Sequence, residues 1–425
     1  MVRACLVALC CIAAGMLASG CGGLADDADA SGVPVLGFVS ARDQSTLYQE
    51  MFQDCEQQSG GAFRIEAITV PTSVDAQREQ LARRLSAGDS SIDIINMDVI
   101  WTAELADAGW ITDLTDQITP MTDRWVPAAL QSLHYRGKYW GIPVGTNAAL
   151  MYYRTDLVKT PPKTWEELVA DVEAVHATNP DIDGFVFQGA PYEGGTVDAL
   201  EFLMGAGNPI LSEDGDTAKL DEGDSAEHAL SFVQSLVKDG VAPKVATTYQ
   251  EEDARLAFQK GDAVFMRNWP YAWALMNQDE QSTIKGKFDI APLPGFDGAG
   301  SASILGGQNL GLAATSKHPK LAWQAMQCMA NEHWQRERAA RKGEMPTLKN
   351  LYTDAALAKQ VPFLDVLAAG LETGVNRPTT PYYNDVSTVI YKAYNDVLNG
   401  HLSPRDAVAR MQGGVQAAID GQAEI

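Results

Sequence analysis

Basic residues are scarce in this sequence relative to acidic ones. The 425 residues contain 32 Lys and Arg against 55 Asp and Glu, which gives a formal net charge of −23 at pH 7. Nucleic acids and anionic lipid surfaces attract proteins through clusters of positive charge. The composition therefore argues against nucleic-acid binding and against a charge-driven attachment to membranes. It favours solubility outside the cell.

Long apolar runs are absent beyond the N-terminus. Residues 1–20 combine Arg3, an apolar stretch too short to cross a bilayer, and small residues before Cys21, which is the pattern of a secretory signal. We expect cleavage before Cys21 and lipidation of that cysteine, which would anchor the protein on the outer face of the cytoplasmic membrane. An ordinary signal that leaves Cys21 free is the alternative. Residues 21–32 are small and acidic and predict a flexible tether.

Few cysteines remain once residues 1–20 are removed: Cys21, Cys55 and Cys328. If Cys21 carries lipid, one pair is left in an oxidising compartment, and a disulfide between Cys55 and Cys328 is predicted. The alternative is two separate buried thiols, because free cysteine behaves as a small apolar residue. The long loop that the bond would close favours it by about 3–5 kcal/mol in the chain-entropy model.

The sequence also lacks the short motifs of common enzyme classes. It contains no Walker loop, no GxGxxG after a strand, no GxSxG and no HExxH. Its six histidines are scattered, none at zinc-ligand spacing, and CxxC is missing after residue 20. These absences argue against nucleotide enzymes, serine hydrolases and metalloenzymes, so that no metal and no cofactor are expected.

Strand and helix patterns alternate after the tether, which is typical of an α/β unit with a parallel sheet. The strand-like segments are residues 33–40, 63–70 and 91–97, and the helix-like segments are residues 43–58, 75–85 and 102–108. Residues 141–158 then predict a strand that crosses to a second unit, followed by a helix with Thr164 as its N-cap. Later segments predict helices at 197–206, 225–239, 251–260, 318–331 and 354–370, and strands at 288–295 and 306–314.

The predicted disulfide bears on how these units connect. A bond to Cys328 would place the helix at 318–331 in the first unit, so that the chain leaves that unit, builds the second and returns. We therefore expect two interleaved lobes with a hinge and a cleft between them. The predicted divisions are 33–145 with 296–350 for the first lobe, and 146–295 with 351–425 for the second.

Carboxylates are the most abundant candidates for chemistry. Asp98 follows a buried strand, and Glu251 and Glu252 begin a helix. Two facing carboxyls could serve a glycosidase, in which one of them has a raised pKa. Ionised carboxylates also accept strong hydrogen bonds from sugar hydroxyls in proteins that only bind. The residues alone leave both interpretations open.

Aromatic residues concentrate at 265–273, where Trp269 lies at a turn between a strand and a helix. A tryptophan there could stack on the apolar face of a pyranose ring, and the alternative is a core tryptophan that caps the helix. Arg377 lies in a polar turn before Pro378. Its guanidinium would suit paired hydroxyls, although an ordinary surface arginine is an equal alternative.

Taken together, these segments resemble the extracellular solute-binding proteins of carbohydrate ABC importers, of the maltose-binding type. The likeness rests on the order and spacing of five stretches: SIDIINMDVIWTAELADAGWITDL, GIPVGTNAALMYYRTDLV, PPKTWEELV, ARLAFQKGDAVFMRNWPYAW and GGQNLGLAATSKHPKLAWQAM. The resemblance implies the two-lobed, type II periplasmic-binding (Venus-flytrap) α/β fold. It further implies a protein that binds a sugar, is not an enzyme, and docks on membrane permease subunits, as a monomer.

Within that family the chain is most similar to the trehalose-binding lipoproteins of actinobacterial importers, through QLARRL, DVIWTAELADAGW, EDARLAF, NWP, GGQNL and NRPTTPYY. The resemblance implies ligand contacts from Asp43, Asp98, Asn147, Glu251, Trp269, Gly307 and Arg377. Gln308 stands where those relatives tend to have leucine and adds a polar group to the cleft. Trehalose is the expected ligand, maltose or another α-glucoside is the alternative, and a secreted glycoside hydrolase is the alternative of a different class.

Overall fold

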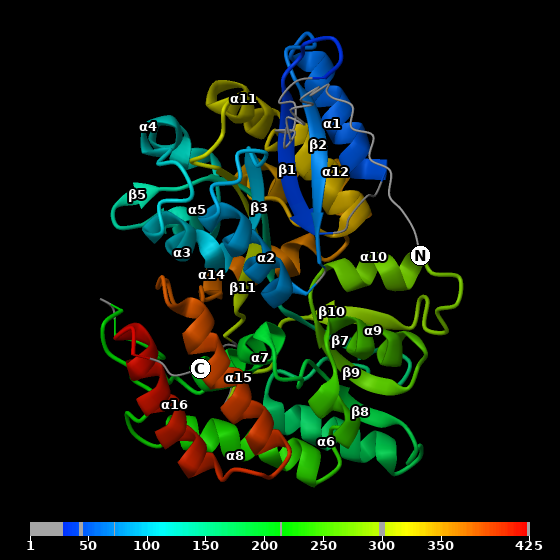
Figure 1. Cartoon of the computed structure of the whole chain (residues 1–425). Coiled ribbons are helices and arrows are strands. Elements are labelled where there is room, and N and C mark those ends of the chain that lie inside the picture. The colour runs from blue at the N-terminus through cyan, green and yellow to red at the C-terminus, as the bar shows by residue number, and fades with distance from the viewer. Residues whose placement is uncertain (1–28, 42–45, 72, 213–214, 297–301, 423–425) are drawn as a thin grey trace, which may run out of the picture.

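The computed structural model of the chain describes residues 29–41, 46–71, 73–212, 215–296 and 302–422 (Figure 1). These residues form two sheets flanked by helices, one above the other in Figure 1, and a short hairpin. The predicted signal, the lipidation site Cys21 and most of the predicted tether lie outside the described residues, as does Asp43. None of the described helices combines the length and the apolarity that a membrane crossing requires.

Lobe 1 is the part of the molecule built on the five-stranded sheet. The strand order is β2-β1-β3-β11-β6. These strands are β1 (Val35–Ala41), β2 (Arg64–Val70), β3 (Ile94–Asp98), β6 (Ile142–Ala148) and β11 (Leu305–Leu312). The predicted parallel core is confirmed for β1, β2 and β3, whereas β11 runs antiparallel to both of its neighbours, β3 and β6. β11 is reversed because the chain enters it on its return from the second sheet.

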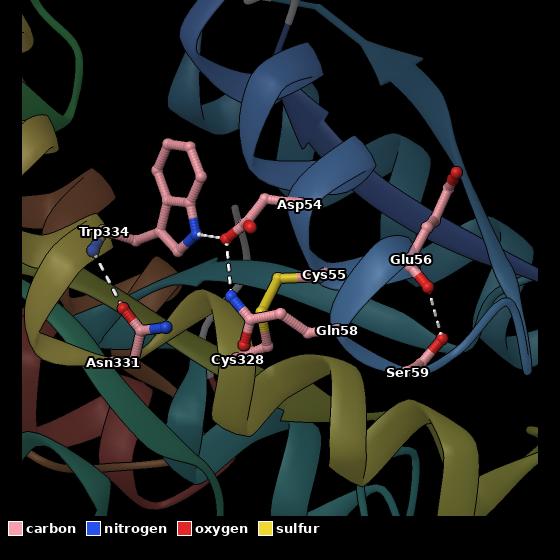
Figure 2. The surroundings of a disulfide bond; sticks show 8 residues. All are labelled: Asp54, Cys55, Glu56, Gln58, Ser59, Cys328, Asn331 and Trp334. Carbon is pink, nitrogen blue, oxygen red and sulfur yellow. Dashed lines mark hydrogen bonds between the residues drawn. A yellow bond between two sulfur atoms is a disulfide. The ribbon is translucent and has the colours of Figure 1, made fainter.

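The helices of lobe 1 come from both ends of the chain. They are α1 (Thr46–Gln58), α2 (Val74–Ser86), α3 (Thr102–Asp107), α4 (Thr115–Ile118), α5 (Pro127–Leu133), α11 (Pro319–Met329) and α12 (Glu332–Lys342), with the hairpin of β4 (His134–Tyr135) and β5 (Lys138–Tyr139). The predicted disulfide is confirmed, since Cys55 of α1 and Cys328 of α11 are bonded with their Cα atoms 5.7 Å apart (Figure 2). The predicted return of the chain to its first lobe is therefore correct.

Lobe 2 is the part built on the four-stranded sheet, whose order is β10-β7-β9-β8. Its strands are β7 (Leu150–Arg154), β8 (Asp183–Val186), β9 (Ala263–Asn268) and β10 (Phe288–Ala291), and its helices are α6 (Trp165–His176), α7 (Glu193–Gly205), α8 (Ser225–Lys238), α9 (Glu251–Gln259), α10 (Tyr271–Gln278), α15 (Tyr383–Leu398) and α16 (Pro404–Ile419). Thr164 caps α6 as predicted, because its side chain accepts a hydrogen bond from the backbone N–H of Glu167.

Some elements differ from those predicted. The single helix expected at 354–370 is two helices, α13 (Ala355–Gln360) and α14 (Leu364–Thr373). Pro362 separates them, since proline has no N–H to donate to a continuing helix. α7 begins four residues before its predicted start at residue 197. The prediction missed this first turn because its two glycines weaken the helical pattern of the sequence.

Within the described residues, three chain segments connect the lobes side by side. The first is Ala149, between β6 and β7, whose carbonyl accepts a hydrogen bond from the Ser303 hydroxyl at 3.1 Å. The second leads into β11, and the third is the stretch after α14, where the backbone N–H of Val375 donates to Ser303 and that of Leu305 donates to Val375, both at 2.9 Å. Adjacent crossings of this kind form a hinge. The residue boundaries predicted for the two lobes stay predictions.

Candidate binding cleft

A cavity of about 400 Å³ lies between the two lobes, beside the crossings. Its volume falls in the range of small-molecule pockets. The sequence-predicted residues that line it are Asp98, Asn147, Glu251, Trp269, Gly307, Gln308 and Arg377. The fold thus brings together every predicted ligand-contact residue except Asp43, which lies outside the described residues.

Arg377 joins the two lobes by a pair of charged contacts. Its Nη2 lies 3.2 Å from Oδ1 of Asp98, at the end of β3 in lobe 1. Its Nη1 lies 2.6 Å from Oε1 of Glu193, in the first turn of α7 in lobe 2. Arg377 is only 7% exposed, and its Nε has no hydrogen-bond partner. The sequence left an ordinary surface arginine as an equal alternative for Arg377, and the burial of this side chain shows that alternative to be wrong.

Glu193 is a buried carboxylate that the sequence reasoning missed. Burial raises the pKa of its carboxyl, and Arg377, Ser387 and Tyr383 oppose that rise. The Tyr383 hydroxyl donates to Oε1 at 2.7 Å, and the Ser387 hydroxyl donates to Oε2 at 2.5 Å. The signal that could have identified Glu193 is its position directly before two glycines at the start of a helix.

A second acidic side chain reaches this network from lobe 1. Burial raises the pKa of Asp75 in α2, as do the nearby carboxylates of Asp98 and Glu251, while the backbone N–H of Glu193 and the guanidinium of Arg78 lower it. Asp75 lies behind the cavity wall, and the wall itself carries the hydrogen-bond acceptors of Asp98, Glu193 and Glu251. A ligand with many hydroxyl donors matches this surface better than an anion.

Trp269 follows β9, as predicted, and its indole ring forms part of the cavity wall. The guanidinium carbon of Arg267 lies 4.4 Å from the ring centroid. Arg267 is 1% exposed and is bound by Glu201, whose carboxylate accepts hydrogen bonds at 2.9 and 2.5 Å, and by Asp198 at 3.2 Å. A buried charge network thus holds the tryptophan ring in place, as a rigid stacking surface requires.

Glu251 and Gln308 are also held by neighbours. The Tyr192 hydroxyl donates to Oε2 of Glu251 at 2.6 Å, and burial raises the pKa of that tyrosine far above its ordinary range. Oε1 of Gln308 accepts a hydrogen bond from Nη2 of Arg338 at 3.0 Å. Gln308 therefore does place a polar side chain at the cavity, as the sequence indicated.

Glycines allow the lobes and the strands to approach closely here. Gly307 has φ of +142°, and a Cβ atom on it would lie 2.3 Å from the carbonyl oxygen of Gly145. A Cβ atom on Gly306 would lie 3.1 Å from the ring of Trp269. A larger residue at either position would shift β11 relative to the cavity wall. The described residues include no cluster of His, Cys, Asp and Glu arranged to hold a metal ion.

Comparisons with known proteins point to one group. The model of a family described as bacterial extracellular solute-binding protein matches residues 42–336. A protein of Deinococcus radiodurans named "Probable ABC transporter-binding protein" is 35% identical over 362 residues, which cover 82% of this chain and 85% of that protein. The solved structure "Maltose bound T. maritima MalE3" is 33% identical, with a TM-score of 0.83, and the match covers 90% of this chain and 99% of that one.

A more distant structure shows likeness of fold alone. The GacH receptor of Streptomyces glaucescens is 19% identical, with a TM-score of 0.81, and the match covers 91% of this chain and 98% of that one. The same two-lobed arrangement therefore extends to proteins that share few residues with this chain.

Proposed function

This chain belongs to the bacterial extracellular solute-binding protein family, and on that premise we propose that it captures a disaccharide between its lobes for an ABC importer. Its fold is the two-lobed type II periplasmic-binding fold predicted from the sequence. Closure about the hinge would trap the sugar, because a ligand that contacts both lobes favours the closed state by its differential affinity. The closed form would then dock on the permease subunits, as a monomer.

The observation that carries the proposal is the composition of the cavity wall. Asp98 and Glu251 offer carboxylates from opposite lobes, and Trp269 offers an aromatic face that a buried arginine holds rigid. Carboxylates accept hydrogen bonds from sugar hydroxyls, and aromatic rings cover the apolar faces of pyranoses. We assign ligand contacts to the seven predicted residues that line the cavity, and to Asp43.

For the sugar itself we propose trehalose, with maltose or another α-glucoside as the second candidate. The resemblance of the NWP, GGQNL and NRPTTPYY segments to trehalose-binding lipoproteins supports trehalose. The maltose-bound relative supports maltose, since it is 33% identical across nearly the whole chain. At about 0.3 kcal/mol per non-hydrogen atom, a disaccharide of about 23 such atoms would bind with a Kd of about 10 µM.

The arrangement favours binding over hydrolysis. A glycoside hydrolase needs one carboxyl that donates a proton to the scissile bond. Glu193 has the raised pKa that such a role requires, but its two oxygens accept hydrogen bonds from Arg377, Tyr383 and Ser387. A carboxylate engaged in this way is poorly placed to protonate a sugar.

We also propose that Cys21 carries the lipid that keeps the protein on the outer face of the cytoplasmic membrane. The small residues before Cys21 and the acidic segment after it support this location. Incorporation of labelled palmitate tests it: the label should enter the wild-type protein and be lost in Cys21→Ser. A Cys21→Ser variant that is labelled equally would refute lipidation at this residue.

Calorimetric titration of the protein with trehalose, maltose, sucrose and glucose tests the function. We expect saturable one-to-one heat with trehalose and none with glucose. Stronger binding of maltose would retain the sugar-binding function and replace the sugar. Continued heat after saturation, with glucose released, would show hydrolysis and overturn the proposal.

A further inference from the structure

One direct backbone contact between the lobes lies in the cavity wall, at Gly343 and Tyr271. Gly343 ends α12 with φ of +66°, and a Cβ atom on it would lie 2.6 Å from the Cα of Tyr271. The same atom would lie 3.0 Å from the Tyr271 nitrogen and 3.2 Å from the Pro270 oxygen. These are main-chain atoms, so no side-chain rotation could relieve the overlap.

The Gly343 side of this contact is fixed to lobe 1. The disulfide joins α1 to α11, and the Trp334 indole N–H in α12 donates to Asp54 in α1 at 2.8 Å (Figure 2). Nearer the end of α12, Nη1 of Arg341 lies 2.6 Å from a carboxylate oxygen of Glu50. α12 therefore moves with α1 as one body.

The Tyr271 side is fixed to lobe 2. The Tyr271 hydroxyl donates to Glu252 of α9 at 2.7 Å. Trp273, in the first turn of α10, packs on Phe288 of β10 with ring centroids 4.9 Å apart. A hinge rotation whose axis lies away from this contact therefore changes the distance between Gly343 and Tyr271.

We infer that Gly343 sets how far the lobes close, because the absence of a side chain there lets the end of α12 touch the start of α10. The inference rests on the proposed function, in which closure traps the ligand. Any Cβ atom at position 343 would act as a spacer at the cavity wall. The spacer would stop closure short of the contact and weaken the binding of any ligand that needs both lobes.

The test is Gly343→Asn, with Gly88→Asn as the matched control. Asparagine tolerates the left-handed conformation, so neither change should disrupt a helix end. Gly88 follows α2 with φ of +71°, and a Cβ atom on it would meet no other atom within 4 Å. Small-angle X-ray scattering with and without trehalose and maltose measures closure, calorimetry measures affinity, and circular dichroism measures folding.

In each condition in which the wild type adopts the compact, closed form, we expect Gly343→Asn to have a larger radius of gyration. Its Kd for the sugar should be raised about tenfold. Gly88→Asn should match the wild type in both. Equal compactness and equal affinity in Gly343→Asn would overturn the inference, as would a wild type that is never compact. Failure of Gly343→Asn alone to fold would also overturn it, since the contact would then serve folding. A wild type that binds neither sugar refutes the proposed function, while the scattering still decides the role of Gly343.

Discussion

Replacing Arg377 with methionine should strongly destabilise the protein near neutral pH. The arginine is 7% exposed and lies between a Glu193 side chain that is 6% exposed and an Asp98 side chain that is 26% exposed. Breaking a buried pair by removing one partner costs about 3–5 kcal/mol. Asp98 keeps access to water, so most of the cost comes from Glu193, and we expect a loss near about 3 kcal/mol in urea denaturation.

The pH dependence identifies the cause. Burial raises the pKa of Glu193, so the folded chain holds this proton more tightly than the unfolded chain does. The free energy of unfolding then falls as pH rises from about 4.3 through the folded pKa. Arg377 lowers that pKa, so its removal widens the fall. The deficit of Arg377→Met should be small in acid, where Glu193 is protonated in either state, and largest near neutral pH.

Two further variants separate this mechanism from a general loss of packing. Arg377→Met with Glu193→Gln removes the stranded charge and should recover part of the loss. Arg405→Met removes an arginine whose side chain is 81% exposed and should stay near the wild type. A deficit in Arg377→Met that is equal in acid and at neutral pH, or no recovery in the double variant, would refute the reasoning.

Two other predictions concern the stacking surface and the disulfide. Trp269→Ala should raise the sugar Kd about tenfold in calorimetry, whereas Trp110→Ala, outside the cavity lining, should leave it unchanged; equal affinity in both would refute stacking. Cys55→Ala with Cys328→Ala should lower the free energy of unfolding by up to about 5 kcal/mol, because the bond joins residues 273 apart. An unchanged urea midpoint would contradict that role for the bond.

The sequence was informative where a site residue follows a strand. Asp98 and Trp269 come at or directly after the ends of β3 and β9, so strand prediction and residue type together indicated the cleft. Counting the cysteines that follow the predicted signal identified the Cys55–Cys328 pair. The alternation of elements also indicated the parallel order of β1, β2 and β3.

Other features depend on contacts that no local pattern records. Glu193 meets Arg377 across 184 residues of sequence and Ser387 across 194, so its burial is a property of the assembled fold. The antiparallel direction of β11 follows from the return of the chain and not from the composition of the strand. The glycines in the first turn of α7 lower its local helical propensity, so this turn depends on the packing of α7 within the lobe.

The position of β11 has a consequence for the order in which the molecule is made. β11 lies between β3 and β6, at the inside of the first sheet, yet it ends at residue 312. As the chain is synthesised from its N-terminus, β3 and β6 have no strand between them until most of lobe 2 exists. The cysteine that pairs with Cys55 is made later still. Lobe 1 is synthesised first, but its sheet cannot be completed until β11 has been made. Until then the open edges of β3 and β6 can pair with other chains.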